Sequence, residues 1–79
     1  MTRSWNDAKL EHEAVWDVAA TLSVRAGPEY LWADPRFIPV AERLVFRYRD
    51  ETGRWPNSDE VEARWPGCLD PESQLRVVK

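Results

Sequence analysis

A repeated apolar pattern marks the N-terminal third of the chain as an amphipathic helix. Apolar side chains recur at the spacing of one helix face, at Leu10, Ala14, Val15, Val18 and Leu22. Gly27 and Pro28 follow this run. Glycine accepts the left-handed conformation that ends many helices, and proline cannot continue a helix. The pattern therefore predicts a helix over about residues 5–25.

The second half of this predicted helix carries more apolar surface than one face needs. Between Ala14 and Val24 the only charged side chain is Asp17. Trp16, Ala20 and Val24 form a second apolar strip beside the main face, at four-residue intervals. A small bundle has difficulty covering both faces. We therefore expect the helix either to be central in the fold or to be covered along this strip by a second chain.

Two more helical segments are expected in the middle of the chain. Proline is favoured at the first position of a helix, so Pro28 indicates one helical turn over residues 28–33. Pro39 opens a longer helix over about residues 39–52, which Gly53 ends. One face of that helix is apolar, at Phe37, Ala41, Leu44, Val45 and Tyr48.

The C-terminal third predicts one more helix and an ambiguous tail. Asn57 and Glu60 have the spacing of a capping box, which opens a helix over about residues 58–65. Residues 68–79 fit a short helix, a strand or an irregular tail. The predicted fold is therefore an all-α bundle of about four helices, formed by a single domain over residues 1–79.

Composition excludes several classes of protein. The chain has 79 residues, of which 43% are hydrophobic and 32% charged, as in small globular domains. No apolar run approaches the roughly 20 residues of a membrane-spanning helix, and no apolar segment typical of a signal peptide opens the chain. We therefore expect a cytoplasmic protein that does not contact membranes.

The residues that usually carry catalysis or bind metals are scarce. There is one cysteine, Cys68, and one histidine, His12, which are too few for a structural zinc site. His12 and Glu13 begin like a zinc-protease helix, but Trp16 stands where the second histidine belongs. We expect no enzyme activity, no metal or other cofactor, and no small-molecule substrate.

Charge is distributed unevenly along a chain whose net charge is −3. Residues 36–54 carry five arginines and three acidic residues, whereas the segments on either side are acidic. The arginines of this middle zone could neutralise phosphates of a nucleic acid. The candidates are Arg43, Arg47, Arg49 and Arg54. The alternative is a solvated helix face on which Arg47 pairs with Asp50 or Glu51.

Residues 46–61 resemble the opening of bacterial helix-turn-helix domains. In those domains a helix ends at glycine, proline follows three residues later, and the next helix begins with a capping residue, a glutamate and an aliphatic residue. The matching residues are Gly53, Pro56, Asn57, Glu60 and Val61. The chain departs from the pattern at Glu62, where alanine is usual, and at Trp65–Pro66–Gly67, where a Leu–Gly turn is usual.

The resemblance implies a DNA-binding regulator whose recognition helix lies near residues 71–79. The side chains that would read bases are Gln74, Arg76 and Lys79. The same order of helix, glycine, proline and helix also forms ordinary helical corners that bind nothing. DNA binding is therefore an alternative hypothesis for this chain.

Five tryptophans in so short a chain favour a different function. Tryptophan fills small cores, and together with arginine it anchors many protein–protein interfaces. We therefore predict a non-catalytic interaction module: an adaptor, or an inhibitor such as the phage-encoded proteins that block a host machine. Its partner would be another protein or a second copy of itself. The predicted binding residues are Trp16, Ala20, Val24, Trp55 and Trp65, with Arg43 and Arg47 as a polar rim.

An acidic surface that mimics DNA is a third hypothesis. Such a surface would bind a nucleic-acid-binding protein. Its residues would be Asp59, Glu60, Glu62, Asp70 and Glu72. Carboxylates near a helix N-terminus are also explained by capping and by the helix dipole, so part of this charge has a simpler role.

Overall fold

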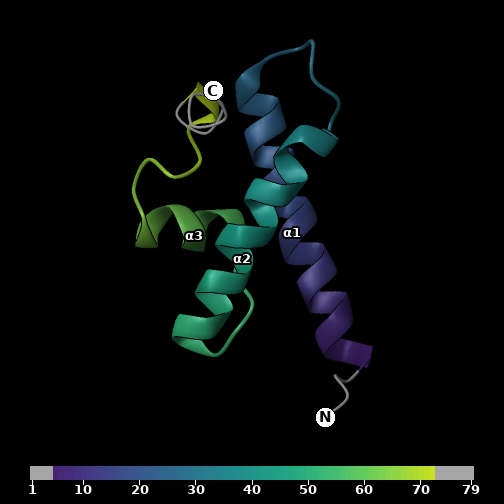
Figure 1. The fold of residues 1–79 in the computed structure, drawn as a ribbon. Coiled ribbons are helices and arrows are strands. Elements are labelled where there is room, and N and C mark those ends of the chain that lie inside the picture. The colour runs from purple at the N-terminus through teal and green to yellow at the C-terminus, as the bar shows by residue number, and fades with distance from the viewer. Residues whose placement is uncertain (1–4, 73–79) are drawn as a thin grey trace.

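The computed structural model describes residues 5–72, and three α-helices dominate this part of the chain (Figure 1). They are α1 (Trp5–Ala26), α2 (Ile38–Thr52) and α3 (Ser58–Arg64), and a short 3₁₀ turn, η1 (Pro35–Phe37), leads into α2. The predicted all-α class is confirmed, but the described residues form three helices and not about four. None of these helices is both long enough and apolar enough to cross a membrane.

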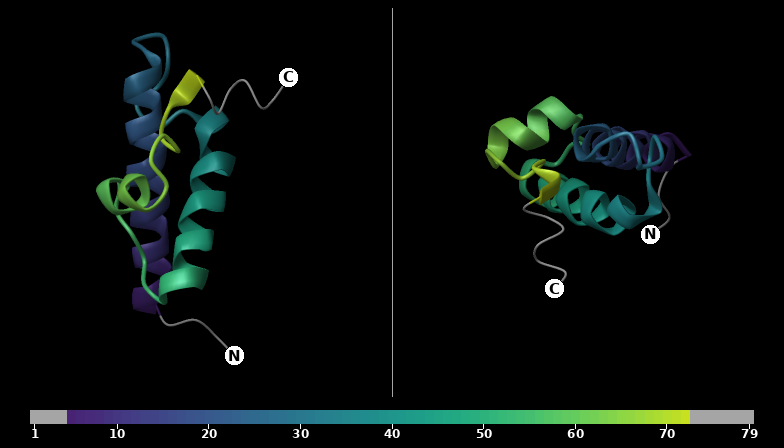
Figure 2. Two further views of the ribbon diagram at one scale, coloured as in Figure 1. Left: turned by 90° about the vertical axis from the view of Figure 1, so that its left-hand side faces the viewer. Right: turned by 90° about the horizontal axis from the view of Figure 1, so that it is seen from above.

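α1 and α2 pack side by side and antiparallel, and α3 lies across them (Figures 1 and 2). Ser58, the first residue of α3, fixes this crossing. Its backbone N–H donates to the Asp17 carboxylate at 2.7 Å, and its hydroxyl lies 2.8 Å from that of Thr21. The lone charge in the apolar half of α1 therefore anchors the third helix.

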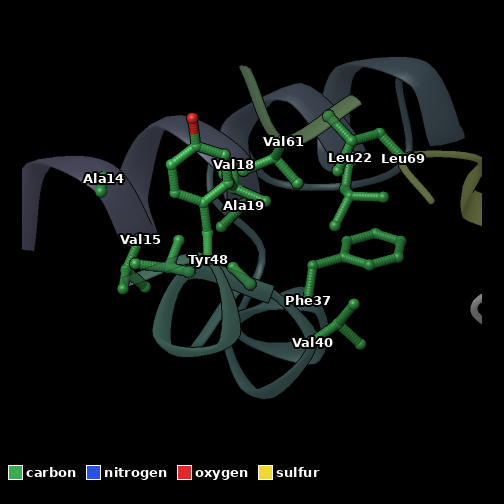
Figure 3. Close-up of a cluster of buried hydrophobic side chains, with 12 residues drawn as sticks. Ala14, Val15, Val18, Ala19, Leu22, Phe37, Val40, Tyr48, Val61 and Leu69 are labelled. Atoms are coloured by element: carbon green, nitrogen blue, oxygen red, sulfur yellow. The ribbon is translucent and has the colours of Figure 1, made fainter. Parts of the chain in front are cut away.

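The core lies between α1 and α2 and is closed by Val61 of α3 and by Leu69 (Figure 3). The predicted apolar face of α1 is buried except at Leu10, which is 48% exposed. That expectation fails because α3 begins opposite Asp17, two turns further along α1, and leaves Leu10 uncovered. Ala19, which lies outside the predicted face, is fully buried and belongs to the core.

The corner between α2 and α3 forms as the sequence predicts. α2 ends at Gly53, whose φ of 82° lies in the left-handed region that glycine tolerates best. Asn57 and Glu60 form a complete capping box: each side chain accepts the backbone N–H of the other residue. The predicted helices over 5–25, 39–52 and 58–65 therefore match α1, α2 and α3 to within one residue at each end.

The helical turn predicted over residues 28–33 is wrong. These residues form a series of turns that connects α1 to η1. The backbone N–H of Leu31 donates to the Asp34 carboxylate, and that of Tyr30 to the Gly27 carbonyl, so neither joins a helical ladder. A short polar side chain that captures backbone donors competes with helix formation, and here it prevails.

A buried polar pair, Ser23 of α1 and Asp34, holds this connection against α1. Ser23 is 1% exposed and Asp34 is 4% exposed. The Ser23 hydroxyl donates to the Ala19 carbonyl at 2.8 Å and accepts the backbone N–H of Asp34 at 2.9 Å. The Asp34 carboxylate in turn caps η1 by accepting the backbone N–H of Arg36. The end of the connection at Asp34 is thereby fixed to α1 and to η1.

We expect Ser23→Ala to lower the free energy of unfolding by about 1–3 kcal/mol, because it leaves the buried N–H of Asp34 without an acceptor. Urea denaturation followed by circular dichroism measures this change. Val24→Ala, at the exposed neighbouring position, should shift stability by no more than about 0.5 kcal/mol. Equal losses for both variants would contradict this role for Ser23.

Candidate docking surface

Two of the tryptophans predicted to bind a partner, Trp55 and Trp65, pack against the core. The Trp55 indole N–H donates to the Asp7 carboxylate at 2.6 Å, which ties the α2–α3 connection to the start of α1. Trp65 follows α3 and meets the Tyr48 ring edge-on, with centroids 6.2 Å apart. Arg47 lies over the Trp65 ring at 5.0 Å. These contacts give both tryptophans a role in holding the helices together.

Trp16 and Trp32, in contrast, form an exposed pair. Their rings stack with centroids 6.3 Å apart and an interplanar angle of 23°, and His12 lies against the other side of the cluster, 5.6 Å from Trp16. Trp16 is 38% exposed and Trp32 68% exposed. Leu31 and Val24, each 67% exposed, line a shallow hollow together with Trp32. We call Trp16, Val24, Leu31 and Trp32 the aromatic patch.

The second apolar strip of α1 is therefore covered only in its middle. Trp32 contacts Trp16 at one end of the strip and shares a hollow with Val24 at the other. Ala20, between them on the same helix face, is buried. Trp32 did not enter the predicted binding set. The sequence does contain a signal for Trp32. Leu31 and Trp32 are two adjacent large apolar residues in a connection bounded by glycine and proline.

A groove between α1 and α2 continues from the aromatic patch. Its apolar lining comes from both helices and from the connection before η1, at Ala8, Val15, Trp16, Ala33, Pro35 and Ile38. Glu11 and Glu42 supply a carboxylate from each helix, His12 also lines the groove, and no lysine or arginine of the described residues does. Glu42 is exposed and makes no ion pair with the described residues. We call this feature the α1–α2 groove.

The arginines proposed to contact phosphates are mostly engaged by carboxylates. Arg47 pairs with Glu51 at 3.0 Å, as expected if this face of the helix is solvated and its charges pair with one another. Arg49 lies 3.7 Å from Asp7, and Arg54 pairs with Glu60. Among residues 5–72, Arg43 alone of the four has no carboxylate partner. The proposed base-reading residues Gln74, Arg76 and Lys79 lie outside the described part of the chain.

The residues of the proposed acidic surface are also partly engaged. Glu62 forms two hydrogen bonds with Arg25, at 2.6 and 3.0 Å, and this guanidinium lowers the pKa of the Glu62 carboxyl. Glu60 caps α3 and pairs with Arg54. Asp70 accepts the backbone N–H of Glu72. Asp59, Asp70 and Glu72 form no ion pair with other described residues, so three carboxylates of the five are left un-neutralised.

The described residues offer little for nucleophilic or metal chemistry. No three His, Cys, Asp or Glu side chains among residues 5–72 converge on a position where they could hold a metal ion. The Cys68 thiol is half-buried and lies 3.6 Å from the Val61 carbonyl, and burial raises its pKa. A thiol of raised pKa is a weak nucleophile at neutral pH. The His12 ring lies tilted against Trp16, at an interplanar angle of 54°.

The pKa of Asp34 predicts an acid sensitivity for the connection that holds Trp32. Hydrogen bonds from the Arg36 side chain, and then from its backbone N–H, lower the pKa of the Asp34 carboxyl far below its usual range. A lowered pKa stabilises the fold above the unfolded-state value of about 3.9, and this stabilisation is lost as the pH falls below it. In Asp34→Asn the free energy of unfolding should be lower than in the wild type at pH 7. This deficit should shrink towards about pH 2.5, as urea denaturation at each pH will measure.

The two kinds of tryptophan should differ in their effect on stability. Trp55→Phe removes the hydrogen bond to Asp7 and should lower the free energy of unfolding by about 1–2 kcal/mol. Trp32→Phe, at an exposed position, should change it by about 0.5 kcal/mol or less. Thermal and urea denaturation of both variants give the comparison. A larger loss for Trp32→Phe would show that this residue serves the core.

Comparison with protein-family models, curated proteins and solved structures finds no match to this chain. Its function is therefore inferred from the chemistry of its own surface.

Proposed function

We propose that this chain is a non-catalytic protein-interaction module, an adaptor or an inhibitor, that docks onto its partner through the aromatic patch. The observation that carries the proposal is the stacked pair of Trp16 and Trp32 at the surface. Exposed apolar groups that adjoin one another mark interaction sites more often than single exposed residues do. Tryptophan is also among the side chains that most often dominate binding energy when a partner covers them.

The way in which the patch is held supports the same proposal. Trp32 lies two residues before Asp34, which is bound to Ser23 and to Arg36. The connection is therefore fixed at the point where it presents its two large apolar side chains. A surface that is ordered before binding loses less conformational entropy in the complex, so more of the contact energy appears as affinity.

The alternative functions have less support from the described residues. Arg47, Arg49 and Arg54 each lie beside a carboxylate, which offsets the charge that would attract phosphates. Two of the five residues proposed for a DNA-mimicking surface are likewise paired with arginines. No residue within 6–72 covers the aromatic patch in a comparable way. The partner itself is proposed to be another protein or a second copy.

Trp32→Ala should reduce binding of the natural partner at least tenfold while leaving helix content nearly unchanged, because the side chain is mostly exposed. We would place a photocrosslinking residue at position 31 in cells of the source organism and identify the protein that it captures. Affinity for that protein would then be measured for the wild type, for Trp32→Ala and for Leu10→Ala. Leu10→Ala is the matched control, since Leu10 is an exposed apolar residue outside the patch.

Light scattering over a range of concentrations tests the second-copy alternative with the same variants. A dimer that Trp32→Ala dissociates and Leu10→Ala does not would identify the partner as a second copy. The proposal fails if Trp32→Ala and Leu10→Ala bind the captured protein as tightly as the wild type does, with no dimer formed.

A further inference from the structure

We infer that the α1–α2 groove receives a basic amphipathic segment of the partner, whose cationic side chains reach Glu42 beside the partly exposed Trp16 ring. This inference rests on the proposed function and deepens it by naming the chemistry of the partner. The groove shares Trp16 with the aromatic patch, so one bound segment can cover both.

The first step is the position of the groove in the fold. α3 covers one side of the α1–α2 pair through contacts of Asp17, Thr21 and Arg25 with its residues. Ala8 and Val15 are seven residues apart, so they lie on one face of α1, and this face lines the groove. It differs from the face of α1 that contacts α3. The chain therefore covers one side of its helical pair with α3, whereas the groove side has no helix from residues 5–72 over it (Figure 2).

The second step is the charge of the lining. The groove combines an apolar floor with carboxylates on both walls, Glu11 on α1 and Glu42 on α2. His12 also lines it, and no lysine or arginine of residues 5–72 does. The neighbouring hollow on the outer face of α2 differs, because Arg43 and Arg47 line it together with Glu42 and Asp50. A third hollow, beside Trp55, is also acidic, but two of its three carboxylates are engaged: Asp17 accepts a backbone N–H of α3, and Glu60 pairs with Arg54. The groove therefore joins an exposed tryptophan to a carboxylate that has no ion-pair partner among the described residues.

The third step is the occupant that fits this combination. An exposed indole face attracts lysine and arginine through its quadrupole, and a nearby carboxylate strengthens the preference for a cation. The apolar floor requires large apolar side chains on the same segment. A second copy of the chain fits less well, because among its described lysine and arginine side chains only Lys9 and Arg43, on separate helices, form no ion pair with described residues of their own chain. A basic amphipathic helix from another protein supplies both groups.

The test uses two synthetic helical peptides that share one apolar face and differ only in their flanking residues, lysine in one and glutamate in the other. Each is titrated into the whole ¹⁵N-labelled chain and followed by NMR. The lysine peptide should shift the indole signals of Trp16 and Trp32 and the backbone amide of Glu42, and its binding should weaken with salt. The glutamate peptide should leave these signals unchanged.

Glu42→Lys and Asp50→Lys form a matched pair of variants, since both carboxylates are exposed on α2 and both changes alter the net charge equally. Glu42→Lys should weaken binding of the lysine peptide by about fivefold to tenfold, and Asp50→Lys by less than about twofold. Equal effects would show a general attraction to an acidic protein and would overturn the inference. So would equal binding of both peptides, binding of neither, or shifts confined to other surfaces.

Failure here is distinguishable from failure of the proposed function. If neither peptide binds but Trp32→Ala still abolishes binding of the captured partner, the aromatic patch is a docking surface and its occupant is not basic. If the lysine peptide binds in the groove but Trp32→Ala leaves the natural partner bound, the proposed function fails and the groove is a separate site. Patch signals that shift with protein concentration alone would identify a second copy as the occupant and would overturn the basic segment.

Discussion

The contact between Ser23 and Asp34 is the constraint on which the arrangement of this chain depends. α1 ends at Ala26 and the chain must reverse within a few residues to lay α2 against it. Asp34 fixes the path of this reversal, because its backbone N–H donates to Ser23 of α1 and its carboxylate caps η1, the turn that leads into α2. Phe37 then enters the core at the end of η1, fully buried. A hydrogen bond between buried groups is costly to leave unmade, which is why so small a contact can fix the path of the chain.

The same constraint shapes the surface. The connection that Asp34 secures carries Leu31 and Trp32, neither of which reaches the core. Trp32 instead lies against Trp16 and produces an ordered apolar surface beside an acidic groove. Arginines of the basic zone, meanwhile, pair within the fold: Arg49 of α2 lies 3.7 Å from Asp7 of α1, and Arg54 pairs with Glu60 of α3. The basic zone therefore links the helices, and an apolar patch beside an acidic groove remains exposed.

Local signals in the sequence predicted the helices well. Periodicity located α1 and α2, glycine placed the end of α2, and the Asn57–Glu60 pair placed the start of α3, because caps and faces depend on neighbouring residues alone. The candidate site was predicted only in part. Trp16 and Val24 lie in the aromatic patch, but Trp55 and Trp65 pack on the core, and Trp32 was missed. A tryptophan in the core and one in an exposed patch have the same neighbours in sequence. Contacts with residues far along the chain decide whether the side chain is buried.

The sequence by itself determined the all-α class, the positions of the three helices within residues 5–72 and the capping of the α2–α3 corner. Tertiary structure alone decided that residues 28–33 form turns, because the group that captures the Leu31 N–H is held in place by Ser23, eleven residues before Asp34. It also decided which arginines face carboxylates on other helices, and which tryptophans are buried. Each of these outcomes depends on distances between segments far apart in the chain, which no periodicity or propensity encodes.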